Sequence, residues 1–346
     1  MKTKSIFVAL TWCLAVCFGM DASAQNMQIA TLQHGDNMKA FYGVDAFREA
    51  MDNALSGDLI SLSSGQFHAP DSIGKAVIIQ GAGMYYREWN PAPTVITEDL
   101  WIIMENENET GLVIEGISMV SDKSIIVYDD IKNFSLVKCK MKDLNFSWDG
   151  GKWQNENILV DRCYIYGDFW VGYASQGFVA RNSYINTFLS HEQEPANRHI
   201  SNCVILRNEN YGQIPAGIYE NNVIKQLGKS DNCVYYNNLY YDAIGSNLIG
   251  NGNYKRDWSF YDVFSGGNPE NQGGYGPNGQ NSNLALTDEA ATTYLGTDGT
   301  QIGVYGGTTP FSITPSSPQI VKSEIAGQSN ADGKLSVKIT VEAGDN

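Results

Sequence analysis

The chain has 346 residues, of which 42% are hydrophobic and 18% are charged, as in ordinary folded globular proteins. Acidic residues outnumber basic ones by 38 to 23, so the formal net charge is −15 at pH 7. A surface of this sign argues against nucleic acid or an anionic membrane as a binding partner.

Residues 1–24 have the pattern of a secretory signal peptide. Two lysines precede an apolar stretch from Ile6 to Phe18, and the small residues Ala22 to Ala24 fit a cleavage site. The apolar stretch is short for a membrane span, so no transmembrane segment is expected. We predict cleavage after Ala24, with lipidation at Cys17 as the alternative. The protein is therefore expected to be secreted, in the periplasm or on the surface of a Gram-negative bacterium.

Residues 25–42 are interpreted as a lead-in to the main domain. Residues 44–55 then have apolar side chains at helical spacing, and Ser56-Gly57-Asp58 ends this predicted helix. The segment Leu59 to Leu62 begins the first strand. A helix in this place can cover the end of a stack of strands, where core and strand edges would otherwise be exposed.

A short phrase repeats between Asn157 and Ile224. Its copies align on a small residue at Cys163, Ser183, Cys203 and Asn222, in steps of 20, 20 and 19 residues. Self-similarity at a fixed period of this length indicates a stack of repeated units. Apolar residues alternate on both sides of each small residue, which predicts two short strands joined by a tight corner.

The corner position carries Arg162 in one copy and Asn in the others, and Asn tolerates the left-handed backbone that a tight corner needs. Upstream and downstream copies extend the pattern over residues 43–260, with coils of about 14 to 24 residues, too short for helical repeats. The sequence therefore predicts an all-β fold. We expect a right-handed parallel β-helix of about ten coils, each spaced ~4.8 Å from the next.

This strand–corner–strand pattern resembles the pectin-lyase-like right-handed β-helix superfamily. The corner residues Arg162, Asn182, Asn202, Asn221, Asn237 and Asn251 are similar to the asparagine ladder of that superfamily, with Arg162 as a departure. The predicted helix at 44–55 resembles the N-terminal cap of secreted alginate-type and chondroitin-type polysaccharide lyases. The resemblance implies a fold and a general binding surface, since one fold serves many activities.

Four cysteines follow the predicted signal peptide. Cys139, Cys163 and Cys203 share one inward position of the repeat, and Cys233 occupies another. Cys163 and Cys203 are two coils apart, which is ~9.6 Å and beyond the reach of a disulfide. We predict that all four are buried free thiols that fill the core.

The repeat ends after Tyr254. Residues 261–317 contain a loop rich in Gly and Asn, followed by a closing segment around Asp298 to Gly307. Residues 318–346 alternate as two strands around the turn signal Asn330 to Gly333. We expect a hairpin that packs on the last coils and covers the C-terminal opening.

The resemblance implies that ligands bind along the third strand of each coil, which should include Gly167 to Val171 and Thr187 to His191. Aromatic residues near this strand could stack on sugar rings while neighbouring polar groups bond sugar hydroxyls. The candidate substrate-binding residues are Trp148, Trp153, Trp170 and Tyr173. Packing in the core or in loops is the alternative for each of them.

Charged residues gather in the next loop, where a lyase could use a cation and a base, or a hydrolase two carboxylates. The weak catalytic candidates are Glu192, Glu194, Arg198, His191 and Lys225. The local signatures of alginate lyases, pectate lyases and polygalacturonases are missing, so solvated loop charge is the alternative. No metal site is predicted, although oxygen ligands between Glu105 and Glu109 leave calcium open as a cofactor.

The resemblance and the aromatic residues together favour a secreted protein that binds or processes a polysaccharide, as a lyase or a hydrolase. A non-catalytic carbohydrate-binding protein and a structural protein of the cell surface are the alternatives. A monomer is expected.

Overall fold

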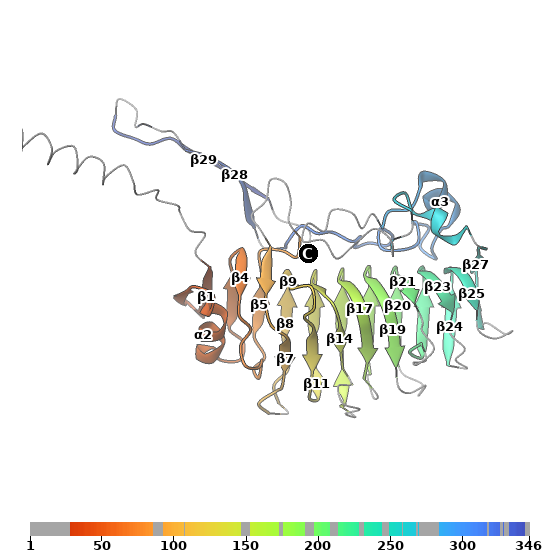
Figure 1. The fold of residues 1–346 in the computed structure, drawn as a ribbon, viewed down its shortest axis with the longest axis horizontal. Coiled ribbons are helices and arrows are strands. Elements are labelled where there is room, and N and C mark those ends of the chain that lie inside the picture. The colour runs from red at the N-terminus through yellow and green to blue at the C-terminus, as the bar shows by residue number, and fades with distance from the viewer. Residues whose placement is uncertain are drawn as a thin grey trace, which may run out of the picture.

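The computed structural model describes most of the chain beyond residue 27. The described residues are 28–85, 93–106, 108–146, 153–172, 176–190, 197–207, 214–227, 232–243, 249–257, 259–267, 269, 284–316, 318–325, 328 and 332–342. The predicted signal peptide lies outside them. Within this part, the chain forms a parallel β-solenoid of about eight turns with few helices (Figure 1).

The first sheet has twelve strands and runs the length of the solenoid. Its order is β2 (Asn37–Tyr42), β1 (Ile29–His34), β3 (Leu59–Leu62), β5 (Ile78–Gln80), β8 (Val113–Glu115), β12 (Ser135–Val137), β16 (Leu159–Asp161), β18 (Phe178–Arg181), β20 (Arg198–Ser201), β22 (Gly217–Glu220), β24 (Cys233–Tyr236) and β26 (Ile249–Asn251). All pairs from β3 onward are parallel, and only β1 and β2 are antiparallel. The ten strands β3 to β26 correspond to the ten coils expected from sequence, whereas complete turns number about eight.

The second sheet has thirteen strands. Its main path is β4 (Gly65–Phe67), β6 (Thr94–Ile96), β9 (Ile117–Met119), β13 (Lys140–Met141), β17 (Tyr164–Val171), β19 (Tyr184–Ser190), β21 (Val204–Arg207), β23 (Val223–Leu227), β25 (Leu239–Ala243) and β27 (Tyr254–Lys255). The strands β7 (Leu100–Ile102), β10 (Ile125–Val127) and β14 (Leu144–Asn145) pair off this path and join the far end of β17. We call these three strands, with the ends of β17 and β19, the branch. A separate pair, β11 (Ile131–Lys132) and β15 (Asn155–Glu156), lies in a connecting turn.

Strand alternation fills the interior with apolar side chains, because every second residue points inward. The small residues of the repeat form one inward column, as expected: Cys163, Ser183 and Cys203 are all fully buried on successive turns. Toward the C-terminal end the column becomes asparagine, and Asn222 and Asn238 accept main-chain hydrogen bonds from the preceding rung at 2.7 and 3.0 Å. These amides satisfy buried donors that an apolar residue would leave unpaired.

The four described cysteines are free and buried, which confirms the prediction. Cys139 and Cys163 lie on neighbouring rungs, and each thiol donates to a main-chain carbonyl. Burial raises the pKa of Cys139 and of Cys203 to about 12. The thiols are therefore core residues of low reactivity.

The corner beside this column is left-handed on successive turns. Arg162, Asn182, Asn202, Asn221 and Asn237 all have φ between 47° and 60°, as the sequence predicted. The predicted ladder was wrong by one residue in the last coil, where Asn251 ends strand β26 and the corner is Gly252, with φ 70°. The step from Asn237 to Gly252 is 15 residues, one more than the 14 that the alignment of the repeats assumed, so the predicted corner came one residue early.

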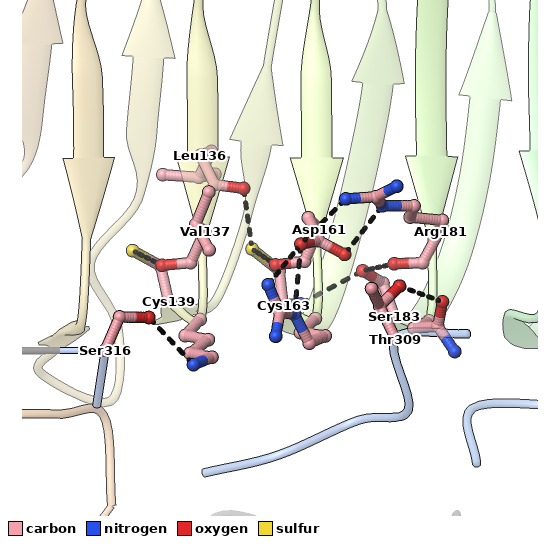
Figure 2. Close-up of polar contacts among 12 residues, drawn as sticks. Leu136, Val137, Cys139, Asp161, Cys163, Arg181, Ser183, Thr309 and Ser316 are labelled. Carbon is pink, nitrogen blue, oxygen red and sulfur yellow. Dashed lines mark hydrogen bonds and ion pairs between the residues drawn. The ribbon is translucent and has the colours of Figure 1, made fainter. Parts of the chain in front are cut away.

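Arg162 stands at a corner position that carries asparagine in most of the later coils. Its side chain turns back onto the preceding residue, Asp161. Its guanidinium donates to Asp161 at 2.7 and 3.0 Å, and Arg181 on the next rung donates to the same carboxylate at 3.0 Å (Figure 2). Asp161 is only 1% exposed. Two guanidinium groups therefore compensate a carboxylate that would be costly to bury alone.

The end of the chain returns along the corner ladder, from the last turns toward the first. Leu295 accepts from Asn237, and Val304 and Gly306 accept from Asn182. Ser316 accepts from Lys138, and Figure 2 shows Ser316 and Thr309 of this segment beside the corner ladder. The segment that makes these contacts, residues 295–316, is called the strap. It includes the stretch from Asp298 to Gly307 that is interpreted from the sequence as a closing segment.

The strap and the short helices η2 (Phe260–Val263) and α3 (Asp288–Thr293) cover the outer face of the second sheet. Outward residues of this sheet, including Tyr164, Tyr184 and Val204, are buried with Ile302 and Val304 of the strap in a second hydrophobic cluster. The rings of Tyr164 and Tyr184 stack with centroids 4.5 Å apart. Outside the branch, the outer face of strands β17 to β25 is therefore closed by the chain itself.

The predicted C-terminal hairpin forms, but not in the predicted place. Strands β28 (Gln319–Ile325) and β29 (Val337–Glu342) pair antiparallel. They follow Ser316, which bonds to Lys138 in the middle of the solenoid, and Figure 1 shows the hairpin nearer to β5 than to β25. Because the strap runs back along the solenoid from the last turns toward its middle, the hairpin that follows it lies far from the last coil.

The N-terminal cap is the helix α2 (Ala46–Asn53), inside the predicted range 44–55. Its residues Phe47, Ala50 and Met51 are buried against β1, β2 and β3. The antiparallel strands β1 and β2 extend the first sheet beyond β3, so the predicted lead-in is itself part of the fold.

Candidate functional site

The outward face of the branch carries tryptophan at two of its rungs. Register places Trp101, Ile126, Asn145, Trp170 and Leu189 in one row. Both tryptophans are partly exposed, whereas the preceding residue on each strand points inward and is fully buried. Trp101 and Trp170 are three rungs apart, or ~14 Å at the usual spacing of strands.

Two further aromatic rings extend this row. The ring of Tyr128, which directly follows β10, lies 6.1 Å from Trp101 and 5.4 Å from Trp153 between centroids. Tyr128 is 37% exposed and Trp153 is partly exposed. The Nε1 of Trp153 is buried and has no hydrogen-bond partner among the described residues. The rings of Trp101, Tyr128, Trp153 and Trp170 are called the aromatic row.

Carboxylates flank the aromatic row at the start of the branch strands β7 and β14. Asp99 accepts from the main chain of Ser124 at 2.9 Å. Asp143 accepts from the Ser124 hydroxyl at 3.2 Å and from the main chain of Asp168 at 2.8 Å. A side chain at Gly167 would meet Asp143 Oδ1 at 2.1 Å, so the bulge in β17 needs glycine there. These aspartates fix the bend between the second sheet and the branch.

The arrangement suits binding better than proton transfer. Partly exposed aromatic rings offer flat apolar faces, and the carboxylates beside them can accept hydrogen bonds from hydroxyl or amino groups. The oxygens of Asp99 and Asp143 already accept bonds from the scaffold, which holds them in fixed positions. The branch is therefore a preorganised polar and aromatic surface.

The structure describes two of the four predicted substrate-binding residues, Trp153 and Trp170. Both lie on the branch side of the solenoid as expected, with Trp170 outward in β17 and Trp153 against Tyr128. Trp148, Tyr173, His191, Glu192 and Glu194 lie outside the described residues, so their roles stay predictions.

Arg198 points into the solenoid. Its side chain is 1% exposed at the start of β20, and its guanidinium donates to the carbonyl of Gly172 at 3.1 Å. Burial lowers the pKa of Arg198. Alternation in β20 explains this placement, since the inward positions are Arg198 and Ile200, and the outward ones are His199 and Ser201. The described branch surface does not include Arg198.

Lys225 lies beyond the aromatic row, near the last turns. Its Nζ is 5.3 Å from the centroid of the Tyr261 ring, a cation–π distance. Close by in the fold, an open groove of about 720 Å³ is lined by Tyr241, Asp242, Lys255, Arg256 and Asp257. The main-chain N–H of Ser259 donates to Asp257 and lowers its pKa. Arg256 is held by the hydroxyls of Tyr294 and Ser259 at 3.0 Å.

Sequence reasoning missed Trp101, Tyr128 and the aspartates of the branch. Trp101 stands between Leu100 and Ile102, both fully buried, so strand alternation alone could have marked it as outward. Its proximity to Trp153 could not have been seen, because the coils between them differ in length.

The acidic turn at residues 105–109 is structural where it is described. Glu109 accepts from the main chain of Ala76 at 2.9 Å and from the hydroxyl of Ser56, and the latter bond lowers its pKa. Across the described residues, no group of three His, Cys, Asp or Glu side chains is placed to hold a metal ion. The carboxylate of Glu109 instead ties the N-terminal turns together.

No known protein family, curated protein or solved structure matches this chain significantly. The helices within the described part of the chain are all too short or too polar to cross a membrane.

Proposed function

We propose that this protein binds a linear polysaccharide lengthwise along the branch. The observation that carries the proposal is the aromatic row: four partly exposed rings on successive turns, beside aspartates held in place by the scaffold. Sugar rings present apolar CH faces to aromatic rings and hydroxyls to polar groups. A secreted member of the pectin-lyase-like superfamily is the identity that best fits this proposal and the asparagine corner ladder.

The charge of the surface narrows the class of glycan. Asp99, Asp143 and Asp168 border the aromatic row, and Lys123 and Lys142 lie 3.8 Å from Asp99 and 3.3 Å from Asp143. These lysines compensate part of the local charge, but the net charge of the whole chain is −15, which repels a polyuronate unless cations intervene. The preferred ligand is therefore a neutral polysaccharide or one that carries amino groups.

The test is affinity electrophoresis in gels that contain neutral, amino-bearing or uronic polysaccharides. Replacing Trp101 or Trp170 with alanine should weaken retention by about tenfold each, since one stacked ring contributes on the order of 1.5 kcal/mol. Tyr42→Ala is the matched control, because Tyr42 is 59% exposed on β2, away from the branch. Unchanged retention of both tryptophan variants, or no retention on any glycan, would reject the proposal.

A second candidate is glycan hydrolysis in the groove at the last turns. Asp242 and Asp257 both line this groove and lie on neighbouring turns, whose main chains are ~4.8 Å apart. Retaining glycosidases place two carboxyl groups about 5 Å apart. The low pKa of Asp257 keeps it ionised, as a nucleophile requires. New reducing ends that disappear in Asp242→Asn and Asp257→Asn would support this activity, and their absence in the unaltered protein would exclude it for the glycans tested.

A further inference from the structure

The outward face of the first sheet carries an aliphatic row that runs the length of the solenoid. Ten rungs in continuous register contribute one residue each, and eight of the ten are Leu, Ile or Val. The row is Leu59, Ile78, Val113, Ser135, Leu159, Val179, His199, Ile218, Val234 and Ile249.

The aliphatic row is exposed to solvent in the single chain. Ile78, Ile218 and Ile249 are 37%, 42% and 52% exposed, and the other members are partly exposed. None of the eight aliphatic members belongs to either hydrophobic cluster of the described residues. Solvated faces of β-sheets normally alternate apolar-in and polar-out, so a row of this length needs an explanation.

The chain covers apolar residues elsewhere on its surface. The strap closes the outer face of the second sheet, where Tyr164, Tyr184 and Val204 are buried. The described part of the strap follows the corner ladder and the second sheet, and it comes nearest to the aliphatic row where Thr297 donates to Glu220, in the next column of the first sheet. Within the described residues, the aliphatic row itself stays open to a partner.

The size of the row fits a second copy of the same chain. Ten rungs at ~4.8 Å give a length of ~43 Å, and two outward side chains per strand give a width of ~13 Å. The face then contributes ~560 Å² from each copy, or ~1,100 Å² in all, about the minimum for a specific interface. A row that repeats at one spacing can also pack against its own reversed copy, as a twofold dimer requires.

Charge complementarity favours one register. Arg181 and Glu220 lie beside the aliphatic row, one rung before and one rung after His199. Both are paired within their own chain, Arg181 with Asp161 at 3.0 Å, and Glu220 with His199 at 2.9 Å and with the hydroxyl of Thr297. In a reversed copy centred on the His199 rung, each Arg181 faces the Glu220 of the other chain and adds an opposite charge to these pairs. A centre on the Val179 rung would instead place the two Arg181 side chains together.

We propose that the aliphatic row of the first sheet is the interface of a homodimer. Two copies pack face to face and antiparallel, with the twofold axis at the His199 rung and the sheets ~10 Å apart. The interface is on a different sheet from the branch, so the inference does not depend on the proposed glycan binding.

Analytical ultracentrifugation of the full chain tests the dimer. The unaltered protein should sediment as a dimer at about 100 μM, and Val179→Glu and Ile218→Glu should each raise the dissociation constant at least about tenfold. Ile103→Glu is the matched control, because Ile103 is also 40% exposed but lies outside the row. A monomer at this concentration, or variants that dimerise like the control, would overturn the proposal. Circular dichroism shows that each variant is folded.

A cysteine scan tests the register. The four native thiols of the described chain are buried, so an introduced surface cysteine is the reactive one. Oxidation of His199→Cys should give a disulfide-linked dimer, because that rung meets itself at the twofold axis. Tyr128→Cys, on the branch, should form no disulfide-linked dimer under the same conditions. Failure of His199→Cys to cross-link would overturn the proposed arrangement.

Discussion

The branch and the first sheet are outward faces of the same turns, with the same spacing of strands, yet their chemistry differs. The branch presents Trp101 and Trp170 beside aspartates, whereas the first sheet presents the aliphatic row. The inward residues of both faces are buried and mostly apolar, with Arg198 of the first sheet as a charged exception. Packing in the core therefore constrains the identity of only every second residue of a strand. The outward residues between them can differ from face to face and so suit different binding partners.

The second sheet completes this comparison. Its outward row would be as exposed as the first, but the strap buries it with Ile302 and Val304. A face that the chain covers itself contributes to stability, and a face left open is available for binding. The predictions below separate these roles.

The largest effect should come from an inward residue beneath the open face. Ile200→Asp places a carboxylate in the core and should lower the free energy of unfolding by at least about 4 kcal/mol. Ile218→Asp, one rung on but outward, should change it by no more than about 0.5 kcal/mol in dilute protein. Urea denaturation measures both. Equal losses would mean that the outward row is part of the core.

The two open faces should act independently, because they share no partner residues. Trp170→Ala should weaken glycan retention about tenfold and leave the dissociation constant of the dimer within about twofold. Val179→Glu should do the reverse. Affinity electrophoresis measures glycan retention, and ultracentrifugation measures the dissociation constant of the dimer, each for both variants. Loss of both properties in either variant would show that the faces are coupled.

The strap should contribute a smaller, separable amount. Asn182→Ala removes its bonds to Val304 and Gly306 and also forces alanine into a left-handed corner, at a total of about 2–3 kcal/mol. Asn182→Gly removes the same bonds without the backbone cost, so about 1 kcal/mol should be lost. Thermal or urea unfolding distinguishes the two. A glycine variant as unstable as the alanine variant would assign the whole effect to the strap bonds.

The smallest effect at neutral pH comes from the buried thiols. The pKa of Cys139 and of Cys203 is raised from 9.0 to about 12, so the folded state holds protons that the unfolded state loses first. Their contribution to stability is complete below pH 9 and falls as the pH rises from 9 toward 12. Urea midpoints across this range, compared with Cys139→Ala and Cys203→Ala, measure it. Rapid alkylation of the folded protein at pH 8 would contradict this account.

The sequence predicted the features that the core enforces. Cys163, Ser183 and Cys203 recur because one inward corner position must be small, and Asn182, Asn202 and Asn221 recur because the adjacent backbone is left-handed. Both requirements repeat in every turn, so the residues that meet them recur in the sequence at the spacing of the coils. The free state of the cysteines followed from the same stacking.

Features without a repeated constraint were not predictable. Trp101 reaches Trp153 through Tyr128 only because coils of unequal length bring their turns together. Arg198 lies inward because the alternation of side chains in β20 places it on the inner face. Its position in the sequence, beside charged loop residues, instead groups it with them. The hairpin was misplaced because nothing in its own residues shows that the strap runs back as far as Lys138.

Side-chain footprinting of the unaltered protein, with and without a retained glycan, tests the assignment of glycan binding to the branch most directly. The glycan should protect Trp101, Tyr128, Trp153 and Trp170 from labelling, while labelling of Leu159, Val179 and Ile218 stays unchanged at constant protein concentration. Protection of the aliphatic row by glycan, with the four rings still labelled, would contradict the account.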